Sequence, residues 1–187
     1  MNLANRLTLF RIILTPFFVA AAVIEAIPLN YLWALAIFAA AGITDFLDGR
    51  IARKYNMVTP FGKFLDPVAD KVLTLCALIC FVELGWVSAW VAALITAREF
   101  VVSGIRLAAV ESDEKIVIQA DVFGKLKTAF TMLAICFFLT CAAVFGKTFP
   151  PGARLTGDAL MYICAALTVV SGIRYAWNYR RIFKPKK

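Results

Sequence analysis

Apolar residues fall in blocks of about twenty, the length at which a helix crosses the ~30 Å hydrocarbon core of a bilayer. Short segments rich in charge, proline or glycine separate these blocks. The pattern predicts an all-α integral membrane bundle of six transmembrane helices, within one domain covering residues 1–187. The expected spans are Thr8–Ile24, Tyr31–Ile51, Pro67–Leu84, Val87–Ala109, Phe123–Phe145 and Ala159–Trp177.

The segment Asn2–Phe10 holds too few apolar residues to cross a membrane. Its apolar residues recur at helical spacing, and we expect Arg6 and Arg11 to face the lipid headgroups. The segment therefore predicts a short interfacial amphipathic helix that lies on the membrane before the first span.

Basic residues are distributed unevenly between the two ends of the expected spans. Of 20 Lys and Arg residues, only Lys147 and Arg154 lie in the turns after the first, third and fifth spans. By the positive-inside rule, both termini and the basic segments are cytoplasmic. The compact chain without a transit peptide suggests a bacterial plasma (inner) membrane. The basic tail Lys184-Pro185-Lys186-Lys187 is expected to contact anionic membrane lipids. No nucleic-acid partner is expected.

The chain contains five cysteines and no histidine. All the cysteines lie inside apolar blocks, which indicates small buried side chains instead of disulfides or a zinc site. Without imidazole, carboxylates or other groups must carry any proton transfer.

Four aspartates occur near the facing ends of the second and third expected spans. They are Asp45, Asp48, Asp66 and Asp70. The first two are three residues apart and the last two are four apart, so each pair shares one face of a helix. If the two helices are neighbours, as the short link suggests, the four carboxylates converge.

Converging carboxylates at a membrane edge need a compensating cation, because one aspartate at a span centre costs about 2.5–3.5 kcal/mol. An all-oxygen cluster suits Mg²⁺ or Mn²⁺. The alternative is a set of helix caps and ion pairs with nearby Lys and Arg, which explains one or two of the aspartates but not four. Gly49 and Gly62 would let a bulky ligand approach the backbone, although Gly62 also suits a turn after Thr59-Pro60.

The complete pattern is Asp45-x2-Asp48-Gly49-x2-Ala52-Arg53-x8-Gly62-x3-Asp66-x3-Asp70. It resembles the signature of the CDP-alcohol phosphotransferase family, membrane enzymes that transfer a phosphatidyl group from a CDP-linked lipid to an alcohol. The resemblance implies that the four aspartates hold two divalent ions, that Asp70 is the general base, and that the protein is a homodimer. It also implies a cytidine diphosphate pocket lined by Gly49, Ala52, Arg53 and Gly62.

Three further stretches, Asn5–Arg11, Thr96–Phe100 and Gly124–Thr128, are similar to the branch of that family whose donor is CDP-diacylglycerol and whose acceptor is glycerol 3-phosphate. An anionic acceptor would explain cations at the cytoplasmic ends of the fourth and fifth spans. These cations are Arg106, Lys125 and Lys127. Ordinary positive-inside charge is their alternative explanation.

Arg98 and Glu99 stand inside an apolar stretch, where ionisable residues usually face a cavity or a partner. We expect Arg98 to contact the acceptor's phosphate; the alternative is that it pairs with an aspartate or with the neighbours of Glu99. Two rival functions remain at this stage: a related enzyme using serine, inositol phosphate, phosphatidylglycerol or an aminoalcohol, and a cation transporter whose aspartates bind its cargo.

Overall fold

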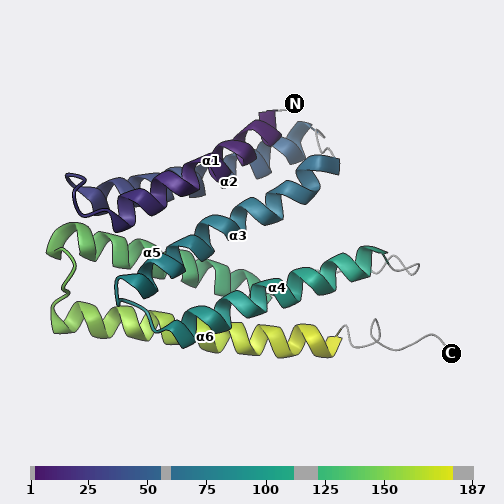
Figure 1. The fold of residues 1–187 in the computed structure, drawn as a ribbon. Coiled ribbons are helices and arrows are strands. Elements are labelled where there is room, and N and C mark those ends of the chain that lie inside the picture. Colours follow the sequence, from purple (N-terminus) through teal and green to yellow (C-terminus); the bar gives the residue numbers. More distant parts are fainter. Residues whose placement is uncertain (1–2, 56–59, 112–121, 179–187) are drawn as a thin grey trace. The chain divides into compact units, whose positions relative to one another are not determined.

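A computed structural model describes residues 3–55, 60–111 and 122–178, with side chains at 8–44, 68–69, 71–105 and 123–177. These residues form six helices and no strand, which confirms the predicted all-α class (Figure 1). The helices are α1 Leu3–Val23, α2 Asn30–Tyr55, α3 Pro60–Glu83, α4 Ala89–Glu111, α5 Val122–Phe145 and α6 Pro151–Asn178.

Among the described residues, two helices are long and apolar enough to cross a membrane, α5 over Phe123–Phe145 and α6 over Pro151–Trp177. Shorter apolar stretches cover Thr8–Val23 and Asn30–Thr44. The full set of six spans stays a prediction.

The chain divides into two compact units. The first contains Met1–Trp86 and Ile135–Arg154, and the second contains Val87–Ala134 and Leu155–Lys187. Helices α5 and α6 therefore contribute to both units, and each unit is described by itself below.

The N-terminal helix differs from its prediction. Helix α1 runs without a break from Leu3 to Val23, so a separate interfacial helix before the first span is wrong. No glycine or proline stands between Leu3 and Thr15, and Pro16 lies inside the continuous helix. The polar residues that suggested a separate segment instead belong to the first turns of α1.

Two helices begin earlier than the apolar pattern predicts, and both begin at a proline. Helix α3 starts at Pro60 and α6 at Pro151, instead of Pro67 and Ala159. Proline suits the first helical position because its fixed φ matches the helix and its missing N–H would have no partner there. Gly62 consequently lies in the first turn of α3, so its alternative role in a turn before the helix is wrong.

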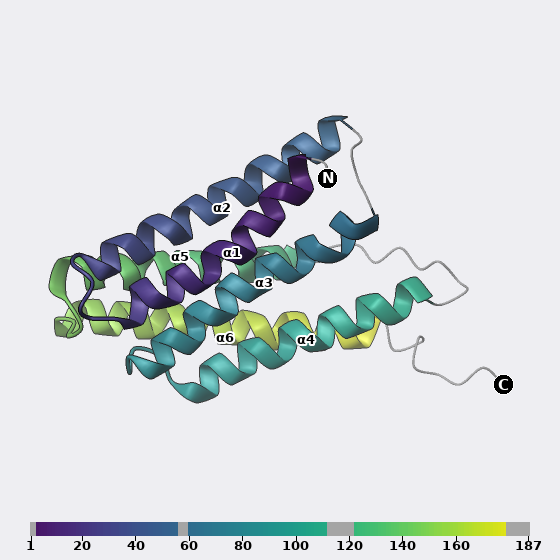
Figure 2. The ribbon, with the colours of Figure 1, turned by 45° about the horizontal axis from the view of Figure 1, so that its top comes forward.

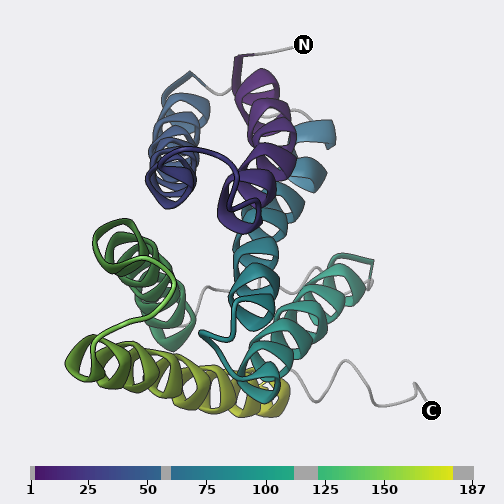
Figure 3. The same ribbon diagram turned by 60° about the vertical axis from the view of Figure 1, so that its left-hand side comes forward.

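In the first unit, α1 packs against both α2 and α3 (Figure 3). One face of α1 is buried at helical spacing, through Thr8, Arg11, Thr15, Phe18 and Ala22. The ring of Phe18 lies 5.9 Å from that of Phe38 on α2, which shows that this face is directed at the neighbouring helices.

A glycine cap ends α3 and fixes the residue that follows. Gly85 adopts φ 72°, its N–H donates to Val82 O at 3.0 Å, and the Trp86 N–H donates to Phe81 O at 2.8 Å. This pair of bonds is a Schellman motif, which characteristically brings together the side chains that here belong to Trp86 and Phe81. Their rings lie 5.2 Å apart.

In the second unit, α4 and α6 meet through Val102, Ile105 and Tyr175, which form a buried apolar cluster. Helices α5 and α6 meet where the guanidinium of Arg174 lies 4.7 Å from the Phe123 ring centroid. The N-terminal half of α5 therefore packs with α6, and α6 packs with α4.

Candidate functional site

The structure places the four aspartates on two helices of the first unit, as predicted. Asp45 and Asp48 lie on α2, and Asp66 and Asp70 lie on α3. Because both segments are helical, each pair shares one helix face. The spacing argument made from the sequence is therefore confirmed at the level of the backbone.

The backbone also gives these aspartates a similar depth. At 1.5 Å per residue, Asp48 lies about 10 Å from the end of α2, and Asp66 about 9 Å from the start of α3. Only residues 56–59 separate the two helices, so those helix ends lie within about 19 Å of each other. Figure 2 shows both ends on the same side of the unit as the start of α1.

The carboxylates themselves lie outside the described side chains, so their convergence on metal ions stays a prediction. The donor set fits the group that it would hold, because four carboxylates supply the hard oxygen ligands that Mg²⁺ and Mn²⁺ prefer. The predicted donor-pocket residues Gly49, Ala52 and Arg53 lie on α2 and Gly62 on α3, also outside the described side chains.

Arg11 is buried, which the sequence pattern did not predict. It is only 3% exposed and lies on the buried face of α1, so the expectation that it faces the headgroups is wrong. Its neighbours on that face, Thr8 and Thr15, are also buried, and the Thr15 hydroxyl donates to Arg11 O at 3.1 Å. The polar residues at spacings of three and four were the available signal.

The acidic residues that α2 and α3 carry indicate what can balance this buried cation. Helix α1 carries no Asp or Glu, whereas α2 and α3 carry the four aspartates and Glu83. Glu83 is exposed and ends α3 on the side away from its aspartates. Apart from the exposed Glu83, the acidic residues of the helices packed against α1 are therefore the four motif aspartates.

A second polar cluster lies in the other unit, around Glu99 of α4. Its Oε1 accepts a hydrogen bond from Lys127 Nζ on α5 and lies 3.3 Å from Arg98 Nη1. The three side chains are only 13% (Arg98), 15% (Glu99) and 5% (Lys127) exposed. Arg98 thus pairs with the carboxylate of Glu99, and Lys127 shares that carboxylate. The contact of Arg98 with the acceptor's phosphate stays a prediction.

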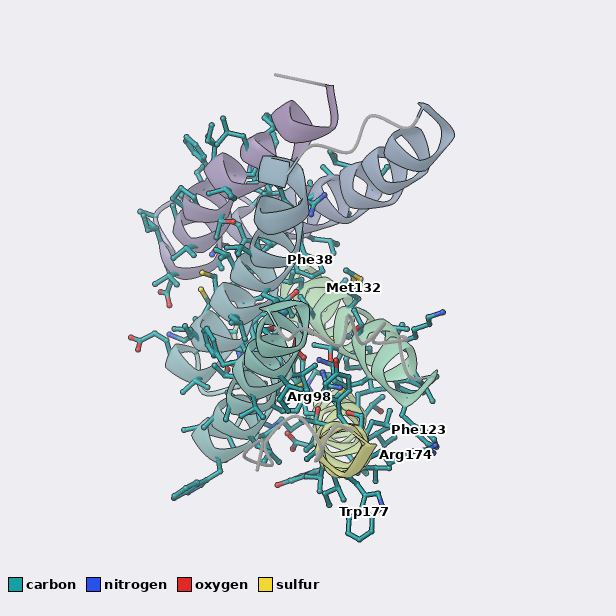
Figure 4. The ribbon with its side chains drawn as sticks, turned by 90° about the vertical axis from the view of Figure 1, so that its right-hand side faces the viewer. Phe38, Arg98, Phe123, Met132, Arg174 and Trp177 are labelled. Atoms are coloured by element: carbon teal, nitrogen blue, oxygen red, sulfur yellow. The ribbon has the colours of Figure 1, made fainter. Side chains whose placement is uncertain are left out.

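Two glycines provide the space through which the Arg98 side chain passes. A Cβ atom at Gly172 of α6 would lie 3.4 Å from Arg98 Cγ, and one at Gly124 of α5 would lie 3.6 Å from Nη2. Figure 4 shows Arg98 extending from α4 toward α5 and α6. The absence of side chains at these positions lets the arginine lie between the three helices.

The predicted group of acceptor-binding cations is only partly brought together. Lys125 is exposed, and residues two apart on a helix do not face the same way, so Lys125 is not directed with Lys127. Arg106 lies two turns after Arg98 on α4, with its side chain outside the described ones. Arg98 and Lys127 are thus the two members that the structure shows sharing one counter-charge.

Buried polar side chains continue from this cluster along α5 and α6. Thr131 lies one turn after Lys127 and donates to its backbone oxygen at 2.9 Å. On α6, Cys164, Thr168 and Ser171 are fully buried on one face. The Thr168 hydroxyl donates to Cys164 O at 2.6 Å and the Ser171 hydroxyl to Thr168 O at 3.1 Å, so these buried hydroxyl groups find acceptors within α6.

Comparisons with known proteins identify the family to which the chain is similar. A family model described as CDP-alcohol phosphatidyltransferase matches residues 1–170. The chain is 38% identical to a Bacillus subtilis protein over 95% of this chain and 93% of that one. It is also 38% identical to proteins of Rickettsia bellii, covering 97% of both chains, and of Salmonella typhimurium, covering 93% of this chain and 92% of the relative. All three relatives are named CDP-diacylglycerol--glycerol-3-phosphate 3-phosphatidyltransferase.

Proposed function

Because the chain belongs to the CDP-alcohol phosphatidyltransferase family, we propose that it transfers the phosphatidyl group of CDP-diacylglycerol to glycerol 3-phosphate. The products are phosphatidylglycerophosphate and CMP. The reaction is a step in phospholipid biosynthesis. The observation that carries the proposal is the complete aspartate pattern on α2 and α3, in a chain similar over nearly its whole length to relatives named for this reaction.

In this proposal the four aspartates would hold two divalent ions, Mg²⁺ or Mn²⁺. Such ions, when bound, neutralise charge on the diphosphate and on the departing CMP. Gly49, Ala52, Arg53 and Gly62 would bind the cytidine diphosphate part of the donor.

The protein's own groups would orient the acceptor and remove its proton. Asp70 accepts the proton of the attacking hydroxyl as general base. A new P–O bond to glycerol 3-phosphate forms as the P–O bond to CMP breaks. No cysteine or histidine stands in the motif to carry a covalent intermediate, so we propose one in-line displacement with inversion at phosphorus.

Arg98 and Lys127 are the residues that we assign to the acceptor's phosphate, since both are cationic and lie inside largely apolar helices. Arg106 and Lys125 are further predicted members of this group. Their positions on α4 and α5 allow a role nearer the membrane surface.

For the protein in its membrane, we propose six spans with both termini and the active site at the cytoplasmic face of a bacterial inner membrane, and a homodimer. The topology is tested in a variant without native cysteines by membrane-impermeant maleimide on intact spheroplasts. Lys147→Cys should be labelled and Lys184→Cys should not, and the reverse pattern would overturn the orientation. Cross-linking in the membrane tests the dimer.

The activity itself is tested by CMP release from purified protein given CDP-diacylglycerol, Mg²⁺ or Mn²⁺, and one candidate acceptor at a time. We expect release that requires glycerol 3-phosphate and metal and disappears in Asp66→Asn. Release only with serine, inositol phosphate or another alcohol would keep the family and overturn the acceptor. Metal flux into liposomes without any CMP release would support the transporter instead.

A further inference from the structure

We propose that Glu99 is the positioning residue of the acceptor's phosphate site. Its carboxylate holds the ammonium of Lys127 and the guanidinium of Arg98 together so that both meet one phosphate monoester. This inference rests on the proposed function, in which these two cations bind the phosphate of glycerol 3-phosphate.

The geometry around Glu99 differs from that of an ordinary ion pair. One oxygen, Oε1, serves two cations from two different helices, Arg98 of α4 and Lys127 of α5. Within α4, Ser103 Oγ also donates to Glu99 O at 2.6 Å. The carboxylate is thus the point at which α4 and α5 are joined by charge.

The charges explain why such a carboxylate is needed. Two cations placed side by side in a poorly solvated interior repel each other and tend to turn apart toward water. One carboxylate between them removes that repulsion but leaves the group of three with a net charge of +1. A phosphate monoester would then meet two cationic donors whose directions the shared carboxylate has already set.

Arg98 lies close to the backbones of two neighbouring helices. Its stem passes Gly172 and its Nη2 lies near Gly124, so neither α5 nor α6 presents a side chain against it at these positions. Glu99 contacts the Nη1 atom and, in this proposal, helps to set the direction of the guanidinium.

The test is a double-mutant cycle on the full-length protein, with KM for each substrate as the measured quantity. We expect Glu99→Gln to raise KM for glycerol 3-phosphate about 10- to 100-fold and to leave KM for CDP-diacylglycerol within about twofold. Lys127→Met should raise the same KM. Adding Glu99→Gln to Lys127→Met should then raise it by less than about threefold more, because the partner is already lost.

Two further variants separate positioning from folding. Glu99→Asp keeps the charge and should recover part of the acceptor KM. Glu83 is an exposed glutamate at the C-terminal end of α3, and Glu83→Gln should leave both KM values unchanged. Inorganic phosphate gives a second measurement: it should compete with glycerol 3-phosphate in the wild type, and its inhibition constant should rise in Glu99→Gln by a similar factor.

Several outcomes would overturn the inference. They are an unchanged acceptor KM in Glu99→Gln, equal rises for both substrates, or effects of Glu99→Gln and Lys127→Met that multiply fully. If Glu99→Gln does not fold, Glu99→Asp enters the same cycle, and the same criteria decide. The activity of the wild type with glycerol 3-phosphate is measured first. If the wild type does not use this acceptor, the proposed function itself is contradicted.

Discussion

The indole Nε1 of Trp86 donates a hydrogen bond to the backbone oxygen of Lys147 at 3.1 Å, joining the turn after α3 to the turn after α5. The same indole lies 5.0 Å from the Phe149 ring and 5.4 Å from the Tyr31 ring. A second bond, from Arg154 Nη1 to Gly85 O at 3.0 Å, joins the same two segments. Trp86 is thus the centre of one end of the first unit.

Trp86→Ala should lower the free energy of unfolding by about 3–5 kcal/mol, because it removes a side chain that is 98% buried among four aromatic rings. Trp86→Phe keeps most of the ring packing and loses the hydrogen bond, so about 1 kcal/mol is expected. Thermal unfolding of the purified protein in detergent measures both. Equal losses in the two variants would mean that the hydrogen bond dominates the packing.

Glu25→Gln is the matched control at the same end. Glu25 accepts a hydrogen bond from Lys147 Nζ at 2.9 Å, and this bond raises the pKa of the Lys147 ammonium. Both side chains are more than half exposed, and exposed ion pairs contribute little to stability. The melting temperature of Glu25→Gln should therefore stay close to that of the wild type.

Arg11→Gln should reduce kcat/KM at least tenfold, because the buried cation on α1 faces the helices that carry the aspartates. It should also lower the melting temperature, since it removes a buried charge. Arg11→Lys should recover part of the activity, since it restores the charge but not the planar group. Lys147→Gln serves as the control, because it removes an exposed cation in the turn after α5. An active Arg11→Gln enzyme would limit Arg11 to a packing role.

Removal of divalent metal should abolish activity, and Mg²⁺ or Mn²⁺ should restore it. Binding is followed separately by the loss of the free Mn²⁺ electron paramagnetic resonance signal on titration with protein. Asp45→Asn should weaken this binding at least tenfold, because one anionic oxygen ligand is lost. Asp158→Asn changes an aspartate of α6 outside the motif and should bind Mn²⁺ like the wild type. Equal binding by both variants would contradict the metal assignment.

The sequence predicted the helical class and the placement of the four aspartates because both follow from local periodicity. The apolar pattern puts the starts of α3 and α6 too late, because polar residues and glycine follow the proline at which each helix begins. Helical hydrogen bonding continued through these residues, since neither glycine nor polar side chains prevent a helix that a proline has begun.

Arg11 and Glu99 show why the rest of the site could not be predicted. The charge of Arg11 suggested the membrane surface, and only the packing of α1 against two helices shows that it is buried. Glu99 was recognised as unusual within an apolar stretch, but its contact with Lys127 joins residues 28 positions apart on different helices. Such contacts depend on the rotation of each helix about its axis, which local spacing does not determine.

The glycine at position 172 gives a test of how closely the Arg98 side chain is held. A Cβ there would lie 3.4 Å from Arg98 Cγ, at the edge of ordinary contact, so Gly172→Ala should change the acceptor KM by less than about threefold. Gly172→Leu cannot be accommodated without moving the arginine, and it should raise the KM for glycerol 3-phosphate at least tenfold. Steady-state kinetics with each substrate varied in turn measure both effects.

Gly104→Leu provides the control, because no atom lies within 4 Å of the position that its Cβ would occupy. Both variants place the same large apolar side chain into a helix, so general effects on helix formation and expression are shared. A rise in acceptor KM for Gly172→Leu alone would show that displacement of Arg98 is responsible. If both leucine variants bind glycerol 3-phosphate normally, the direction of Arg98 does not govern acceptor binding, and Lys127 must contact the phosphate without it.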